Sequence, residues 1–197
     1  MSALFRNLVP KRDSLGFIRK YSSGHEPFVL SSGEVVRVRK CSLMFKEWRG
    51  RRLRHTFGEK MTVDVSGKPQ FAELAIADFF KRHGFAVRWV ETYGRGGGLP
   101  MFLLDWQYRP YKEQTDNPVE EQWVMDTLKR VATLNGNSYS GCWDVIAWDN
   151  GTVFFIESKR FKRDRLRESQ RRWLDAGLRS GLVSENFVVV EWDIVPL

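Results

Sequence analysis

The sequence predicts an α/β fold, with a mixed central sheet flanked by helices and a basic, strand-rich extension on its N-terminal side. Two apolar runs on either side of Asn150-Gly151 predict a β-hairpin, because Asn-Gly is a preferred two-residue turn. Apolar residues recur at helical spacing over residues 69 to 83 and again over residues 163 to 180. Residues 187 to 195 form an apolar run that predicts a buried final strand. Helices interleaved with strands in this way are typical of an α/β domain.

The N-terminal third of the chain predicts strands. Between residues 27 and 65, β-branched and aromatic residues alternate with arginines, and Ser32-Gly33 predicts a hairpin turn. Residues 66 to 69 (SGKP) have a turn-forming composition. We therefore expect a basic extension over residues 1–66 and a core domain over residues 67–197.

The core domain is predicted to begin with the helix over residues 69 to 83, because Pro69 suits the first turn of a helix. The elements expected between this helix and the hairpin are a strand over residues 85 to 92 and, within an insertion over about residues 99–140, a helix over residues 118 to 134 capped by Asn117.

The charge balance favours a polyanionic partner. Among 197 residues, 32 lysines and arginines outnumber 24 acids, which gives a net charge of +8. The excess gathers in residues 37 to 54 and 159 to 172, and basic blocks interleaved with aromatic residues are typical of nucleic-acid binding. A basic surface that is merely solvated is the alternative. The first 24 residues are basic and poor in acids, a composition shared with organellar transit peptides, although a basic arm is the favoured interpretation.

The same composition excludes several classes of protein. No apolar run approaches the roughly 20 residues that a membrane-spanning helix needs, so no membrane partner is expected. Cys41 and Cys142 are far apart and match no metal-binding spacing, which argues against a disulfide scaffold and a zinc finger. A cytoplasmic or nucleoid-associated location is expected, with organellar targeting by the N-terminal arm as the alternative. Any metal ion is expected to be held by carboxylates.

The hairpin around Asn150-Gly151 brings charged residues together. A two-residue turn pairs Asp149 with Thr152, and the same register places Asp144 opposite Glu157. Directly opposed residues point to the same side of a sheet. Lys159 lies two residues beyond Glu157 and points the same way, because strand side chains alternate. The sequence therefore places two carboxylates and an amine on one face of the hairpin.

Two opposed carboxylates destabilise a sheet unless something positive lies between them. A divalent cation would do so, because Mg²⁺ is usually held by one or two carboxylates, waters and substrate phosphate. The alternative is that Lys159 alone neutralises the pair. Gln170 lies on the apolar face of the helix predicted over residues 163 to 180, four residues after Leu166. Its partner is either a backbone group or a water or phosphate at the metal.

The order of these features resembles the PD-(D/E)XK nuclease superfamily, and within it the VRR-Nuc type. The resemblance covers about residues 69 to 195 and leaves the N-terminal third unexplained. It is carried by Glu73 in the first helix, Gly141-Cys142-Trp143-Asp144, Phe155-Ile156-Glu157-Ser158-Lys159 and Gln170-Arg171-Arg172-Trp173. Trp143 stands where that type usually has proline, and residues 99–140 are a longer spacing than expected.

The resemblance implies a restriction-endonuclease-like core and a hydrolase that cuts phosphodiester bonds with Mg²⁺ or Mn²⁺. Asp144, Glu157 and the Ser158 carbonyl would be metal ligands, and Glu73 would help through water or a second ion. Lys159 would orient or activate the attacking water, and Gln170 would support the site. The expected substrate is DNA, in particular structured or branched DNA, and a homodimer or a larger nucleoprotein assembly is possible for this type.

Basic residues in both blocks are expected to bind the nucleic acid: Arg49, Arg51, Arg52, Arg160, Lys162, Arg163, Arg167 and Arg171. Three alternatives stay open at this point. The chain could cleave RNA, it could grip nucleic acid on the same fold without cutting, or its basic face could meet an acidic protein partner.

Overall fold

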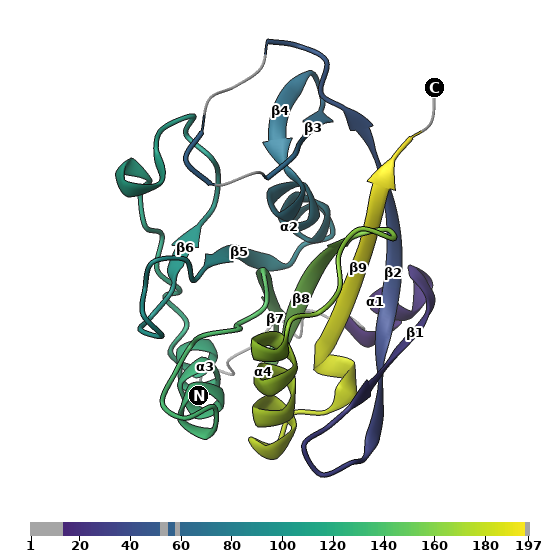
Figure 1. The fold of residues 1–197 in the computed structure, drawn as a ribbon, viewed down its shortest axis with the longest axis vertical. Helices are drawn as coiled ribbons and strands as arrows, with labels where there is room; N and C mark the ends of the chain where they lie inside the picture. Colours follow the sequence, from purple (N-terminus) through teal and green to yellow (C-terminus); the bar gives the residue numbers. More distant parts are fainter. Residues whose placement is uncertain (1–13, 52–54, 58–59, 196–197) are drawn as a thin grey trace, which may run out of the picture.

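The computed structural model describes residues 14–51, 55–57 and 60–195, and has an α/β architecture with one large sheet (Figure 1). In chain order the elements are α1 (Ser14–Lys20), β1 (Ser22–Val29), β2 (Val35–Glu47), β3 (Thr62–Val65), β4 (Lys68–Phe71), α2 (Ala72–Arg82), β5 (Ala86–Glu91), β6 (Met101–Leu103), a 3₁₀ turn (Tyr111–Glu113), α3 (Gln122–Leu134), β7 (Val145–Asp149), β8 (Thr152–Arg160), α4 (Glu168–Arg179), a second 3₁₀ turn (Ser184–Asn186) and β9 (Phe187–Ile194).

The nine strands form a mixed, largely antiparallel sheet in the order β4-β3-β2-β9-β8-β7-β5-β6, with β1 paired to β2. β9 is parallel to both β8 and β2. The strands predicted between residues 27 and 65 are confirmed, and β2 joins them to the sheet by pairing along β9. The N-terminal strands and the core strands are therefore parts of one sheet.

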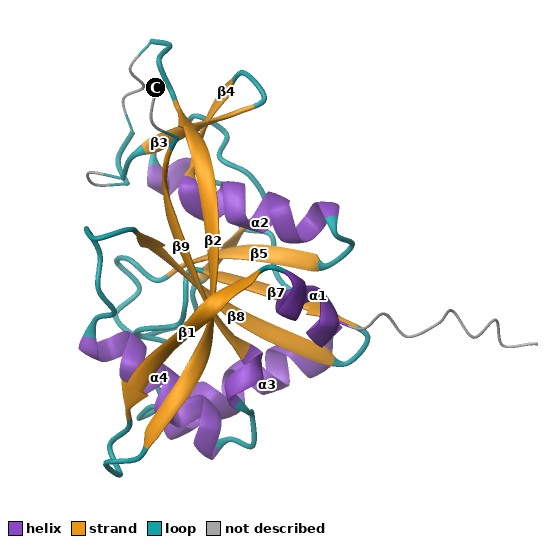
Figure 2. Cartoon of the chain, turned by 90° about the vertical axis from the view of Figure 1, so that its right-hand side faces the viewer, coloured by secondary structure: helices purple, strands orange, loops and turns teal. Residues whose placement is uncertain are grey.

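Helices cover both faces of this sheet (Figures 1 and 2). Side chains of β7 and β8 alternate between the faces: Ile146 and Phe155 pack with residues of α3 and α4, whereas Val145 and Ile156 pack with residues of α1 and α2. None of the helices in the described part of the chain is long and apolar enough to cross a membrane.

The direction of three neighbouring strands decides where the site forms. β5 and β8 both run antiparallel to β7, so their C-terminal ends meet the beginning of β7 at one end of the sheet. Acidic residues stand at or near these three ends: Glu91 is the last residue of β5, Asp144 directly precedes β7, and Glu157 lies three residues before the end of β8. Strand topology thus gathers residues that are far apart in the sequence.

Three predicted element boundaries are wrong. The first helix starts at Ala72 instead of residue 69, because residues 68–71 pair with β3 as β4, and Pro69 is tolerated there on a short strand near the edge of the sheet. The second helix starts at Gln122 with Glu121 as its N-cap. Asn117, the predicted cap, lies before the helix, and its N–H donates to the Phe102 carbonyl.

The last predicted helix also starts later, at Glu168. Residues 161–167 form a loop that begins where the Asp164 carboxylate accepts a hydrogen bond from the Arg160 N–H at 3.0 Å. This side-chain acceptor stabilises a turn in place of a helical one.

Candidate active site

The Asn150-Gly151 hairpin has the predicted register. Both turn residues have positive φ angles, 42° and 91°, as a type I′ turn requires. Asp149 pairs with Thr152 and the ladder continues as far as Val145 opposite Ile156. The next step of this register sets Asp144 against Glu157.

Beyond the last pair of the β7–β8 ladder, the Asp144 side chain replaces the backbone as the hydrogen-bond acceptor for β8. Its Oδ2 accepts a hydrogen bond from the Ser158 N–H at 3.0 Å, while its carbonyl accepts one from the Val90 N–H of β5 at 2.7 Å. Because the N–H and C=O of one strand residue point to the same side, the Ser158 carbonyl also faces the Asp144 side of β8. Asp144 is thereby fixed between β5 and β8.

Glu157, Lys159 and Gln170 form a compact buried group beside Asp144. Glu157 Oε1 lies 2.7 Å from Lys159 Nζ and accepts a hydrogen bond from Gln170 Nε2 at 2.5 Å. Gln170 Oε1 in turn accepts from Lys159 Nζ at 3.2 Å and from the Arg167 N–H at 2.9 Å. Gln170 therefore has the backbone partner expected for it, at the first turn of α4, and in addition contacts the side chains of Glu157 and Lys159.

The second carboxylate oxygen of Glu157 has no hydrogen-bond donor, although the side chain is fully buried. The neighbouring Asp144 carboxylate is another acceptor and can satisfy it only if one of the two groups carries a proton. Burial, reinforced by the charge of Asp144, raises the pKa of Glu157 well above its usual range, and Lys159 opposes this rise. Burial also raises the pKa of Asp144, against the opposing charges of Lys60 and Lys159.

Glu73 joins the cluster from the other side through a residue that the sequence did not single out. Its carboxylate forms an ion pair with Lys60, in the segment between β2 and β3. Glu91, at the end of β5, is the second residue missed: it is only 8% exposed and accepts a hydrogen bond from the Tyr93 N–H at 2.9 Å. Glu91 could have been found from the sequence, because it is an acid at the end of an apolar strand. Lys60 lies in an irregular segment, whose sequence contains no pattern that points to a site.

The segment directly before β7 is in close contact with the start of α4. Trp143, in the position where proline was expected, is fully buried, and its indole N–H donates to the Gln170 carbonyl at 3.1 Å. Gly141 has φ of +84°, and a Cβ there would lie 2.1 Å from the Ser169 carbonyl oxygen. Only glycine allows this approach, which sets the distance between Asp144 and Gln170.

Gly141→Ala is expected to lower the free energy of unfolding by about 3 kcal/mol or more, because backbone strain and a clash with Ser169 add together. Gly136→Ala is the matched control: its φ is +73°, but a Cβ there meets nothing within 4 Å, so strain alone should cost about 1 kcal/mol. Urea unfolding of both variants measures the difference, and equal losses would contradict the proposed close approach.

The predicted nucleic-acid-binding residues of the first basic block lie beyond the end of β2. Arg49 and Arg51 are exposed, and Arg49 Nε lies 3.5 Å from the carboxylate of Glu47. Arg52 lies outside the described residues. Arg49 and Arg51 lie on the segment that leads toward Lys60.

The residues of the second basic block follow the site directly. Lys162, Arg163, Arg167 and Arg171 are exposed on the loop after β8 and on the start of α4. Arg160 differs, because it is half-buried with its guanidinium 5.8 Å from the Trp192 ring centre and its Nε 3.5 Å from the carboxylate of Asp193. The loop carries its positive charge directly after Lys159 in the chain.

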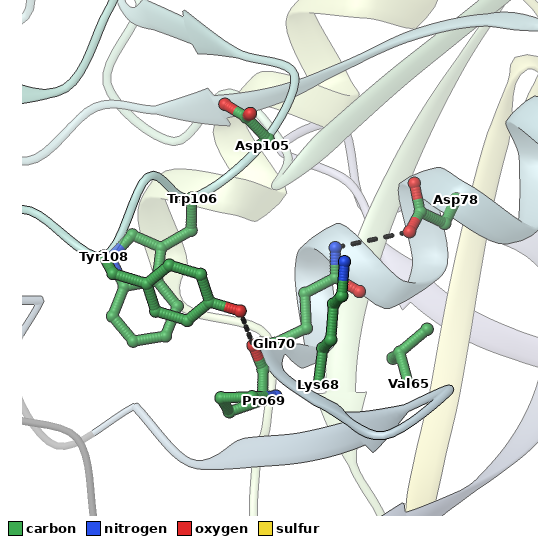
Figure 3. Close-up of a pocket in the computed structure, with 8 residues that line it drawn as sticks. All are labelled: Val65, Lys68, Pro69, Gln70, Asp78, Asp105, Trp106 and Tyr108. Carbon is green, nitrogen blue, oxygen red and sulfur yellow. Dashed lines mark hydrogen bonds between the residues drawn. The ribbon is translucent and has the colours of Figure 1, made fainter.

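A separate pocket lies where the β3–β4 hairpin meets the segment after β6 (Figure 3). Gln70 Nε2 donates to Asp78 at 3.3 Å on one side, and the Tyr108 hydroxyl donates to the Pro69 carbonyl at 3.3 Å on the other. The remaining lining residues are Val65, Lys68, Asp105 and Trp106. None of the predicted site residues lines this pocket.

The oxygen atoms of the site fit a hard cation better than its arrangement of side chains at first suggests. No group of three or more His, Cys, Asp and Glu side chains within the described ranges is arranged as a metal site. Glu157, however, is fully buried and Asp144 half-buried, both carboxyl groups have raised pKa values, and one oxygen of Glu157 lacks a donor. With the Ser158 carbonyl facing the same side, these residues fit a single hard cation that takes oxygen ligands.

Comparisons with known proteins leave the origin of this arrangement open. No protein-family model matches the chain, and no curated protein or solved structure matches it either. The resemblance to PD-(D/E)XK nucleases therefore stays a prediction from the sequence.

Proposed function

We propose that this protein is a divalent-metal-dependent nuclease that hydrolyses phosphodiester bonds in DNA. The observation that carries the proposal is the fully buried Glu157 carboxylate, which has one oxygen without a donor and lies beside a second carboxylate, Asp144. Burying such a pair is costly unless a cation compensates it. A site retained at this cost indicates function more strongly than structure.

Asp144, Glu157 and the Ser158 carbonyl would hold Mg²⁺ or Mn²⁺. Such an ion, when bound, polarises a phosphate and lowers the pKa of a water molecule. Lys159 Nζ, held at 2.7 Å from Glu157 and 3.2 Å from Gln170, supplies a fixed positive charge for the charge that develops on the phosphate. Gln170 keeps both Lys159 and Glu157 in place through its two amide atoms.

The exposed basic loop after β8 supports a nucleic-acid substrate over a small phosphate ester. Its cations lie directly beyond Lys159 in the chain, so a phosphate backbone that crosses the loop would pass the site. DNA, and structured or branched DNA in particular, is proposed from the resemblance to the VRR-Nuc type. A homodimer or a larger nucleoprotein assembly is proposed from the same resemblance.

A cleavage assay tests the proposal. The protein is incubated with labelled single-stranded, duplex, flap and four-way-junction DNA and with matched RNA, in Mg²⁺, Mn²⁺ or EDTA. Cleavage that requires metal would support the nuclease and identify its substrate. Salt-sensitive binding without cleavage under any condition would favour the non-catalytic module instead, and cleavage of RNA alone would reassign the substrate. Binding that does not respond to salt would favour a protein partner.

Charge reversal in the loop should weaken binding. The variant Arg163→Glu/Arg167→Glu/Arg171→Glu is expected to lose at least about tenfold in DNA affinity and to show a shallower salt dependence, because each lost phosphate contact reduces counterion release. Arg19→Glu/Lys81→Glu/Lys129→Glu, three exposed changes on α1, α2 and α3, alters the net charge by the same amount and is the control. Fluorescence anisotropy at two salt concentrations measures both quantities, and equal affinities for the triple variant and the control would contradict the placement.

A further inference from the structure

We infer that Lys60 takes the position of a second metal ion in the candidate active site, so that the site binds a single divalent cation. The inference rests on the proposed metal-dependent function and concerns its Glu73 side. From the sequence, Glu73 could act through a second metal ion. Here the ammonium group of Lys60 takes the place of that ion.

Lys60 is held in the cluster by contacts on several sides. Its Nζ forms an ion pair with Glu73, whose side chain is 13% exposed. The same Nζ lies 5.2 Å from the ring centre of Trp89, a fully buried residue of β5. An ammonium packed on an aromatic ring and paired with a mostly buried carboxylate has a fixed position.

Three acidic residues from different parts of the fold set the electrostatic environment of Lys60: Glu73 of α2, Glu91 of β5 and Asp144 before β7. Burial works to lower the pKa of Lys60, but the negative charges of Glu73, Asp144 and Glu91 raise it overall. Lys60 in return lowers the pKa of Asp144 and of Glu91 against the effect of their burial. The ammonium thus compensates three carboxylates at once, as a bound cation would.

The balance of charges in the cluster agrees with one further cation. Among the described residues, Glu73, Glu91, Asp144 and Glu157 face two ammonium groups, those of Lys60 and Lys159, so two negative charges stay uncompensated there when all four acids are ionised. A single divalent cation carries that charge. The donor-free oxygen belongs to Glu157, which pairs with Lys159, whereas Lys60 pairs with Glu73, so we place the missing charge on the Asp144–Glu157 side.

The number of Mn²⁺ ions bound per chain tests the inference directly. Free Mn²⁺ is followed by its EPR signal during titration of the wild-type protein, Lys60→Met and Lys60→Arg. Wild type and Lys60→Arg should bind one ion, whereas Lys60→Met should bind a second one between Glu73, Glu91 and Asp144. Adding Glu91→Gln to Lys60→Met removes a ligand and should return the number to one.

Lys81→Met is the matched control, because Lys81 is exposed near the end of α2. Lys60→Gln is measured in parallel, so that poor folding of Lys60→Met, checked by circular dichroism, does not decide the result. Two ions in the wild type, or one ion in folded Lys60→Met and Lys60→Gln, would overturn the inference and leave the metal site standing. No Mn²⁺ bound by the wild type would refute the proposed metal site and the inference with it.

Discussion

Glu157→Gln is expected to abolish metal-dependent cleavage and, at the same time, to make the metal-free protein more stable. The exchange keeps the size of the side chain and the oxygen that accepts hydrogen bonds from Lys159 and Gln170. It replaces the donor-free oxygen with an amide that can donate to Asp144. We expect cleavage to fall by at least about 10²-fold, since a metal ligand is lost. Lys159 keeps the negative charge of Asp144 near it in this variant, so that at pH 8 the free energy of unfolding should rise by about 1 to 3 kcal/mol.

The gain in stability should depend on pH in a defined direction. Because the pKa of Glu157 is raised in the folded state, its stabilising contribution is present below the ordinary carboxyl pKa of about 4.3 and is lost as the pH rises through the folded value. The difference between Glu157→Gln and wild type should therefore grow from pH 5 to pH 8. Mg²⁺ should reduce it, because the ion stabilises only the folded wild type.

Urea unfolding in EDTA and in Mg²⁺, at both pH values, measures these effects. Glu34→Gln removes a charge from an exposed turn residue and serves as the control, with no change expected in either cleavage or stability. A Glu157→Gln variant that still cleaves DNA at the wild-type rate, or that is less stable than wild type at pH 8, would refute the role given to the donor-free oxygen.

Lys159→Met should abolish cleavage and also destabilise the fold. The sequence alone predicts only the loss of cleavage. In the structure Lys159 is the ion-pair partner of a fully buried carboxylate, and its own side chain is only 12% exposed. Removing one member of a buried pair leaves the other uncompensated, so we expect the metal-free protein to lose about 3 kcal/mol of unfolding free energy at pH 8.

The double variant Lys159→Met/Glu157→Gln separates the pair from its members. It should recover most of the stability lost by Lys159→Met, because neither charge of this ion pair is left without the other, but none of the cleavage. Lys162→Met, an exposed change three residues further along, should leave the stability within about 0.5 kcal/mol of wild type. Additive stability losses in the double variant would show that Lys159 and Glu157 do not act as a pair.

Much of the site could be predicted because it is built from one hairpin. Asn150-Gly151 sets the register through its backbone angles, and the alternation of side chains then puts Glu157 and Lys159 on one face with Asp144 opposite. These are local rules with few alternatives. Gln170 could be placed on the packed face of a helix, but its double role at the helix start and at Glu157 needed the contact between α4 and β8.

The boundaries that could not be predicted depend on partners distant in sequence. Residues 68 to 71 have a composition that suits a helix start, yet they pair as a strand because β3 lies beside them. Residues 163 to 167 continue the helical spacing of α4, but the Asp164 carboxylate accepts the Arg160 N–H and holds a turn instead. In both cases a tertiary or side-chain contact outweighs a weak local preference.

The sequence by itself determined the hairpin, its paired acids and the lysine on their face, because turn chemistry and strand alternation act over a few residues. Only the tertiary structure decided that Glu91 and Lys60 belong to the same cluster. β5 brings Glu91 to this end of the sheet by pairing with β7, and the segment between β2 and β3 sets Lys60 between Glu73 and Trp89. Such placements come from the order of strands and the packing of buried side chains, which no local spacing encodes.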